Sequence, residues 1–252
     1  MLTDAAEPPF RLKFRPLLVT VLLGIAVTIG SSVLALLLFR ALHLSPPQKS
    51  LLTFLYVQHG LQLLLALLGI AILKRRFAPA DYGLHWPRGK RYFLAAILWG
   101  LLLATAVNAG SSWLDVALHL KQTSGDVVYT HRNIWGWALF EWVYVGPTEE
   151  IPFRALLVTY LATAMPGKLR FGRFTINGAG VVVALLFALA HLQTFWVENP
   201  IGALVQQGYA FTLGVLYAYW LEKSRSIIAP ILAHNCSDGI TTVFWALGIF
   251  QH

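Results

Sequence analysis

Seven long apolar segments constrain the fold of this chain more than any other feature of its sequence. Each holds the roughly 20 apolar residues that a helix needs to cross a bilayer. Only 12% of the residues are charged, against about 25% in an ordinary soluble domain. We therefore predict an all-α, polytopic membrane bundle with about seven transmembrane helices, or eight if one segment is split. The segments are Leu17–Phe39, Leu51–Leu73, Phe93–Leu118, Trp135–Met165, Asn177–Trp196, Ile201–Leu221 and Ile227–Phe250.

The loops between these segments are too short for a separate soluble domain, so we expect one membrane domain over residues 1–252. The motifs described below place its catalytic core at about residues 135–250. The 19 Lys and Arg outnumber the 11 Asp and Glu, and most of them lie on alternate loops. Because Lys and Arg favour cytoplasmic loops, this pattern predicts a multi-pass protein with a cytoplasmic N-terminus. This topology accounts for the excess of basic residues, so we predict no nucleic acid partner.

The fourth segment carries two adjacent acids, Glu149 and Glu150, followed by Arg154. Ionisable side chains at membrane depth are energetically expensive and normally face a bundle interior or a wet cavity, so they indicate a functional site. Glu150 and Arg154 are four residues apart and can pair on one helical face, while Glu149 points about 100° away. Pro147 and Pro152 predict a kink in this helix, and thus a cavity beside the acids.

Two further apolar segments carry polar pairs with helical spacing. The fifth places Phe187 and His191 four residues apart, and the seventh repeats that spacing with His234 and Asp238. A carboxylate and an imidazole can together take a proton from water, and a second imidazole can donate to the oxyanion that forms when this water attacks a peptide carbonyl. We therefore predict peptide bond hydrolysis within or near the membrane.

These residues resemble a known family of intramembrane proteases. The pattern of Glu149, Glu150 and Arg154, then Phe187 and His191, then His234 with a polar residue four positions on, is similar to the CAAX prenyl endopeptidase type 2 family, also called the CPBP or Abi family. The three motifs occur in the family's order, each on its own apolar segment. The resemblance covers residues from about 135 to 250.

The resemblance implies a role for each of these residues. Glu149 would activate water with help from His191, Glu150 and Arg154 would form a supporting pair, and His234 would help to form the oxyanion hole. The family usually has Asn at the position of Asp238, and an ionised aspartate cannot donate a hydrogen bond to an oxyanion. Asp238 could instead be protonated, orient His234, or belong to a metal site.

The resemblance also implies the substrate, which is a peptide or a membrane protein, with or without a lipid at its C-terminus. We expect no cofactor. The alternative within the enzyme class is a zinc-dependent protease, because two histidines with one or two carboxylates also form catalytic zinc sites. The chain lacks the His-Glu-x-x-His motif. The alternative outside the enzyme class is a membrane scaffold or transporter that uses the same residue types.

By default we assign His59 and Glu141 to interhelical hydrogen bonds or interface positions, because neither lies in a recognisable pattern.

Overall fold

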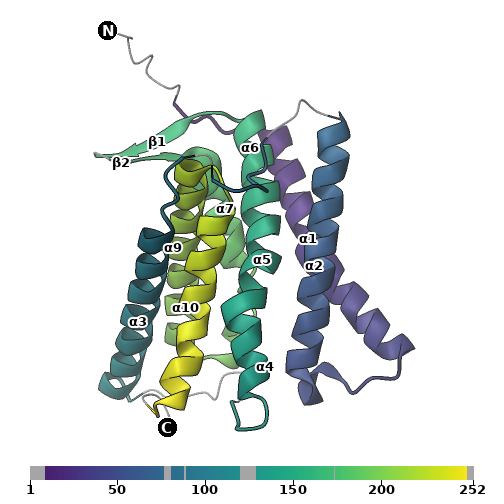
Figure 1. The fold of residues 1–252 in the computed structure, drawn as a ribbon, viewed down its shortest axis with the longest axis vertical. Helices are drawn as coiled ribbons and strands as arrows, with labels where there is room; N and C mark the ends of the chain where they lie inside the picture. Colours follow the sequence, from purple (N-terminus) through teal and green to yellow (C-terminus); the bar gives the residue numbers. More distant parts are fainter. Residues whose placement is uncertain (1–8, 77–80, 88, 120–128, 173, 249–252) are drawn as a thin grey trace.

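The computed structural model describes residues 9–76, 81–87, 89–119, 129–172 and 174–248 (Figure 1). Each of the seven predicted segments is helical over most of its length in this part of the chain, although Phe250, the predicted end of the last one, lies outside it. The single long helices are α1 (Phe14–Ala41), α2 (Leu51–Arg76), α3 (Phe93–Ala117), α9 (Pro200–Ser224) and α10 (Ile228–Ala246). A short 3₁₀ helix, η1 (Pro47–Lys49), precedes α2.

The fourth segment is a composite rod rather than a single kinked α-helix. Two of its parts are π-helical, which is rare and frequently marks functional sites. Pro152 lies in the second of these parts, where the wider turn accommodates the missing backbone N–H. The rod comprises α4 (Ile134–Leu139), η2 (Phe140–Tyr144), α5 (Val145–Glu150), η3 (Ile151–Val158) and α6 (Thr159–Ala164), of which η2 and η3 are π-helical.

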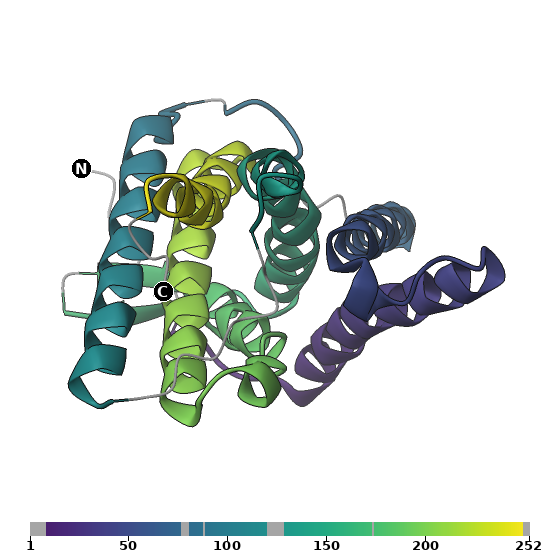
Figure 2. The same cartoon turned by 90° about the horizontal axis from the view of Figure 1, so that it is seen from below.

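The composite rod lies at the centre of the bundle. Seven of the eight residues of η3 are buried, from Pro152 to Val158. Helices α1 and α2 lie on one side of the rod and α3 lies on the other, against α10 (Figures 1 and 2). The approach of α3 to α10 requires a residue without a side chain, because a Cβ atom on Gly100 would collide with the backbone carbonyl of Ala233.

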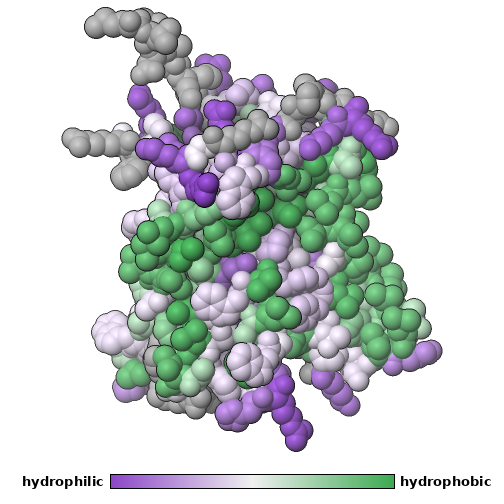
Figure 3. All heavy atoms as spheres, in the orientation of Figure 1, coloured by the Kyte–Doolittle hydropathy of each residue, from purple (hydrophilic) through white to green (hydrophobic). Residues whose placement is uncertain are grey.

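The outer surface is apolar around the middle of the bundle. Many large hydrophobic side chains of α1 and α3 are exposed, and hydrophobic residues form a broad band between more polar ends in Figure 3. Exposed apolar area of this extent indicates contact with lipid. The chain is an integral membrane protein by this criterion.

Only four of the seven predicted spans meet a criterion of length and hydropathy for crossing a membrane: Phe14–Ala41, Leu51–Arg75, Phe93–Leu114 and Gly178–Val197. Within the described residues these four are candidates for membrane-spanning helices, and the predicted count of seven is not confirmed. The other three segments fall short for visible reasons. The composite rod is divided into short helices, α9 carries Gln206 and Gln207 in its apolar part, and α10 carries the polar run Asn235–Asp238.

Two further features differ from the predicted bundle of single helices. A β-hairpin, β1 (Lys168–Phe171) and β2 (Phe174–Asn177), joins the composite rod to the fifth segment in what the sequence suggested was a loop. The fifth segment itself is not one helix. It consists of α7 (Gly178–Leu189) and α8 (Thr194–Val197), separated by a turn.

Candidate active site

The adjacent acids at the end of α5 face two different surroundings. The Glu150 side chain is completely buried in the bundle, whereas that of Glu149 is 15% exposed and lines a cavity. The bundle holds this part of α5 against α10 at Gly146, whose backbone N–H donates to Asn235 Oδ1 over 2.7 Å. Any Cβ atom at position 146 would collide with the Asn235 side chain. A neighbouring helix thus satisfies a backbone donor at the start of the proline-containing turn.

Glu150 is the centre of a buried ionic cluster. Its Oε1 accepts a hydrogen bond of 2.7 Å from His234 Nδ1 and lies 3.0 Å from Arg154 Nη1. The predicted pairing of Glu150 with Arg154 is present, but the geometry at Nη1 is that of an ion pair without a hydrogen bond. Charges buried this deeply are tolerated only when compensated, so removing one partner is expected to be strongly destabilising.

Aromatic rings enclose the charged groups of this cluster. The Arg154 guanidinium lies 4.2 Å from the ring centroid of Phe187 and 5.0 Å from that of Tyr217. The Tyr217 ring also stacks on the imidazole of His234, with centroids 5.1 Å apart. These cation–π and stacking contacts explain Phe187 in the second motif, since its ring fixes Arg154 rather than taking part in chemistry.

The cavity beside Glu149 has a volume of about 550 Å³. Among the six predicted site residues, Glu149, His191 and Asp238 line it, whereas Glu150, Arg154 and His234 do not. Its wall combines apolar side chains with several polar ones that the motifs do not include: His59, Asn108, Tyr129, Glu141, Gln206, Tyr209, Ser237 and Thr241. A cavity that combines apolar walls with convergent polar groups is typical of a site for a small or extended ligand.

His191 lies in the turn after α7, not on its helical face as predicted. The helix ends at Leu189, and His191 Nδ1 lies 2.8 Å from the Phe187 carbonyl. Because a carbonyl oxygen only accepts, Nδ1 carries the proton and Nε2 of the neutral ring is the acceptor. Gln207 fixes the same turn by donating to the His191 carbonyl. The turn thus leaves Nε2 available to accept a hydrogen bond.

His234 is surrounded by carboxylates on both sides of its ring. Besides the bond from Nδ1 to Glu150, its Nε2 lies 3.3 Å from Asp238 Oδ2 and 3.7 Å from Glu149 Oε2. When Glu150 and Asp238 are ionised they offer only acceptors, and contacts at both nitrogens then favour the doubly protonated, positively charged ring. Asp238 is placed to orient His234. Asn235, three positions before Asp238, is turned toward α5 and does not line the cavity.

Two polar residues of the cavity wall were assigned only structural positions from the sequence. Glu141 receives hydrogen bonds from the hydroxyls of Tyr129 and Thr241, at 2.6 and 2.8 Å. His59 of α2 lies beside Glu149, with Nδ1 3.8 Å from Oε1. The assignment of His59 to an interhelical hydrogen bond holds, through Thr148, but it omitted the contact with Glu149. No local motif signals this contact, because the two residues are 90 positions apart.

No group of three or more His, Cys, Asp or Glu side chains is arranged to hold a metal ion within the described ranges. We therefore derive no catalytic step through a metal.

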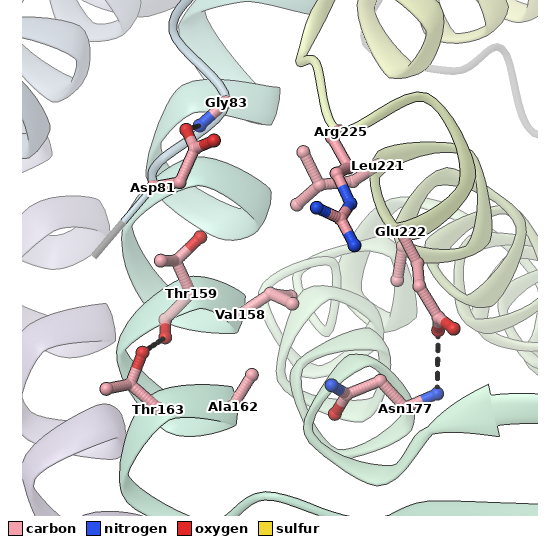
Figure 4. A pocket seen from close by; sticks show the side chains of 11 residues that line it. Asp81, Gly83, Val158, Thr159, Ala162, Thr163, Asn177, Leu221, Glu222 and Arg225 are labelled. Carbon is pink, nitrogen blue, oxygen red and sulfur yellow. Dashed lines mark hydrogen bonds between the residues drawn. The ribbon is translucent and has the colours of Figure 1, made fainter. Parts of the chain in front are cut away.

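A second cavity, of about 540 Å³, lies away from these residues near the hairpin and the end of α9 (Figure 4). It contains no predicted site residue. Its acids are engaged in local contacts, because Asp81 pairs with His85, and Glu222 binds both Lys168 and the backbone of Asn177. The cavity beside Glu149 is therefore the better candidate for an active site.

The fold and site define a helical membrane protein with an acid–base cluster inside its bundle. Residues 131–240 match the family model for type II CAAX prenyl endopeptidases, Rce1-like. This match confirms the resemblance predicted from the three motifs, and it indicates a CAAX-type membrane protease at the level of the family. Comparisons with curated proteins and with solved structures found no match.

Proposed function

We propose that this protein is an intramembrane endopeptidase that hydrolyses a peptide bond with water activated by Glu149 and His191. The observation that carries the proposal is the division of the paired acids. Glu149 reaches the cavity, while Glu150 is buried behind it with Arg154 and His234. A general base needs access to its substrate, and a charged supporting group needs compensation, so the two positions suit two different roles.

In the proposed reaction Glu149 takes a proton from water as the oxygen attacks the scissile carbonyl carbon. His191 accepts a hydrogen bond at Nε2 from the other O–H of this water and so orients it. The carbonyl becomes an oxyanion, and the positive charge of His234 stabilises it at short range. Its Nε2–H reaches the oxyanion when substrate replaces the contact with Asp238. When the carbon–nitrogen bond breaks, Glu149 returns its proton to the leaving amine.

The proposal assigns the remaining predicted residues to support. Glu150 and Arg154 hold His234 from the buried side, and Asp238 holds it from the cavity side. We place this chemistry in a core of about residues 135–250 within a single membrane domain. The substrate we propose is a peptide or membrane protein, and a C-terminal lipid would lie along the apolar part of the cavity. The reaction needs no cofactor.

Cleavage of a fluorogenic farnesylated CAAX peptide by the detergent-purified protein tests this function. Glu149→Gln should lower kcat by about 10²- to 10⁴-fold, the usual contribution of a general base. Glu222→Gln, which alters an acid of the other cavity, should keep the activity. A chelator should not change the cleavage activity of either protein. Loss of wild-type activity with the chelator would move the mechanism to zinc, and a matched peptide without the farnesyl group tests the need for the lipid.

If the wild type cleaves no peptide, Glu149→Gln can be used to trap bound substrates from membranes. The absence of both cleavage and a trapped substrate would favour the scaffold or transporter.

We also propose that the N-terminus is cytoplasmic. Helix α1 begins and α10 ends at opposite ends of the bundle (Figure 1), which suits an odd number of crossings. A reporter that is active only outside the cytoplasm should be active when fused to the C-terminus. An inactive reporter would indicate the opposite orientation.

A further inference from the structure

His59 stands outside the family match, on a helix that carries none of the three motifs. Its side chain is buried, and the ring of Phe140 packs edge-on against it with centroids 5.0 Å apart. The imidazole nevertheless lines the cavity beside Glu149. A buried imidazole held in one orientation next to a proposed general base requires a reason beyond packing.

The hydrogen bonds around His59 determine where its proton lies. The Thr148 hydroxyl donates to the backbone carbonyls of Tyr144 and Val145, at 2.8 and 2.9 Å, so its single proton is already used. His59 Nδ1, 3.2 Å from Thr148 Oγ1, must therefore be the donor in that contact. The Nδ1–H thus faces the space between Thr148 Oγ1 and Glu149 Oε1, which is 3.8 Å away.

Glu149 consequently lies between two imidazoles from different helices. His59 of α2 faces its Oε1, and His234 of α10 faces its Oε2 at 3.7 Å. Both distances exceed those of hydrogen bonds, and catalytic contacts of this length often shorten when substrate binds. His234 also contacts the carboxylates of Asp238 and Glu150.

We propose that His59 is a positioning residue that orients Glu149 through its Nδ1–H and stabilises the negative charge of that carboxylate. The proposal rests on the proposed function, in which Glu149 is the base. It extends the active site to α2, beyond the segment that matches the family. A donor to Oε1 leaves the carboxylate in one orientation toward water, so its loss should lower kcat rather than substrate binding.

Two variants of similar size test this role. Asparagine places an amide N–H near the position of Nδ1, whereas glutamine places it near Nε2. His59→Asn should keep kcat within about threefold, and His59→Gln should lower it roughly tenfold with KM unchanged, as expected for a lost hydrogen bond to a charged group. Gln62→Met is the matched control, because Gln62 also joins α2 to α5, through the Thr148 carbonyl, but does not face Glu149. It should keep kcat.

A second measurement does not depend on catalysis. A hydrophobic carbodiimide labels protonated carboxyl groups, and mass spectrometry reads the label at Glu149. Labelling should rise in His59→Gln, because the charge of Glu149 loses the nearby N–H, and should stay at the wild-type rate in His59→Asn and Gln62→Met. Equal labelling in all four proteins would overturn the role of His59. If the wild type cleaves no peptide, the proposed function falls, while the labelling still decides whether His59 acts on Glu149.

Discussion

The buried cluster around Glu150 and the cavity beside Glu149 differ in almost every physical respect, although the two acids are neighbours in sequence. Behind α5, Arg154, Glu150 and His234 are packed against aromatic rings and are nearly inaccessible. In front of α5, Glu149 has space, partial exposure and contacts longer than hydrogen bonds. Two adjacent residues on one helix thus face different surroundings because their side chains point about 100° apart, and the proposed function assigns support to one and chemistry to the other.

The largest expected difference between the two regions is in their contribution to stability, and a substitution in the buried cluster tests it. Arg154→Leu removes the cation that faces Glu150 and leaves that carboxylate with His234 alone. We expect the free energy of unfolding to fall by about 3–5 kcal/mol, as for other broken buried pairs. Unfolding of the purified protein in mixed micelles, followed by circular dichroism, measures the change. The matched cavity-side variant Glu149→Gln should change stability by less than about 1 kcal/mol, and equal losses in both variants would abolish the distinction.

Much of this division was predictable from the sequence because it depends on helical spacing. The spacing of four residues between Glu150 and Arg154 predicted their pairing, and the three motifs predicted the resemblance to the family. The end of α7 at Leu189 was not predictable, since the apolar run continues past it and the turn at His191 depends on tertiary contacts with Gln207. The short hairpin strands and the π-helical turns have no comparable periodic signal.

The contact between His59 and Glu149 was not predictable for a different reason. Sequence patterns report which residues share a face of one helix, whereas this contact depends on how α2 packs against α5. A lone polar residue in an apolar helix is compatible with either an interhelical hydrogen bond or a site. Only the packed arrangement places His59 at the cavity.

Asp238 lies at the boundary between the two regions, because it lines the cavity and contacts the buried His234. Its replacement tests whether this contact matters for catalysis. Asp238→Asn keeps an acceptor for His234 Nε2–H, so we expect kcat to change by less than about threefold. Asp238→Leu removes the acceptor and should lower kcat roughly tenfold, the effect of losing a hydrogen bond to a charged group. Steady-state cleavage of the farnesylated peptide measures both. A large loss in Asp238→Asn would mean that the charge of Asp238, rather than its position, is required.

The smallest expected effect lies in the packing of the buried side. Tyr217 provides two things to the cluster: a ring against His234 and Arg154, and a hydroxyl that lies 2.7 Å from Ser237 Oγ. Tyr217→Phe keeps the ring and removes only the hydroxyl, so the free energy of unfolding should fall by about 1 kcal/mol and kcat should stay within about twofold. Tyr217→Leu, which removes the ring as well, should be less stable than Tyr217→Phe. If instead Tyr217→Phe abolished cleavage while its unfolding was unchanged, the hydroxyl would act in the reaction, and the buried side of α5 would no longer be support alone.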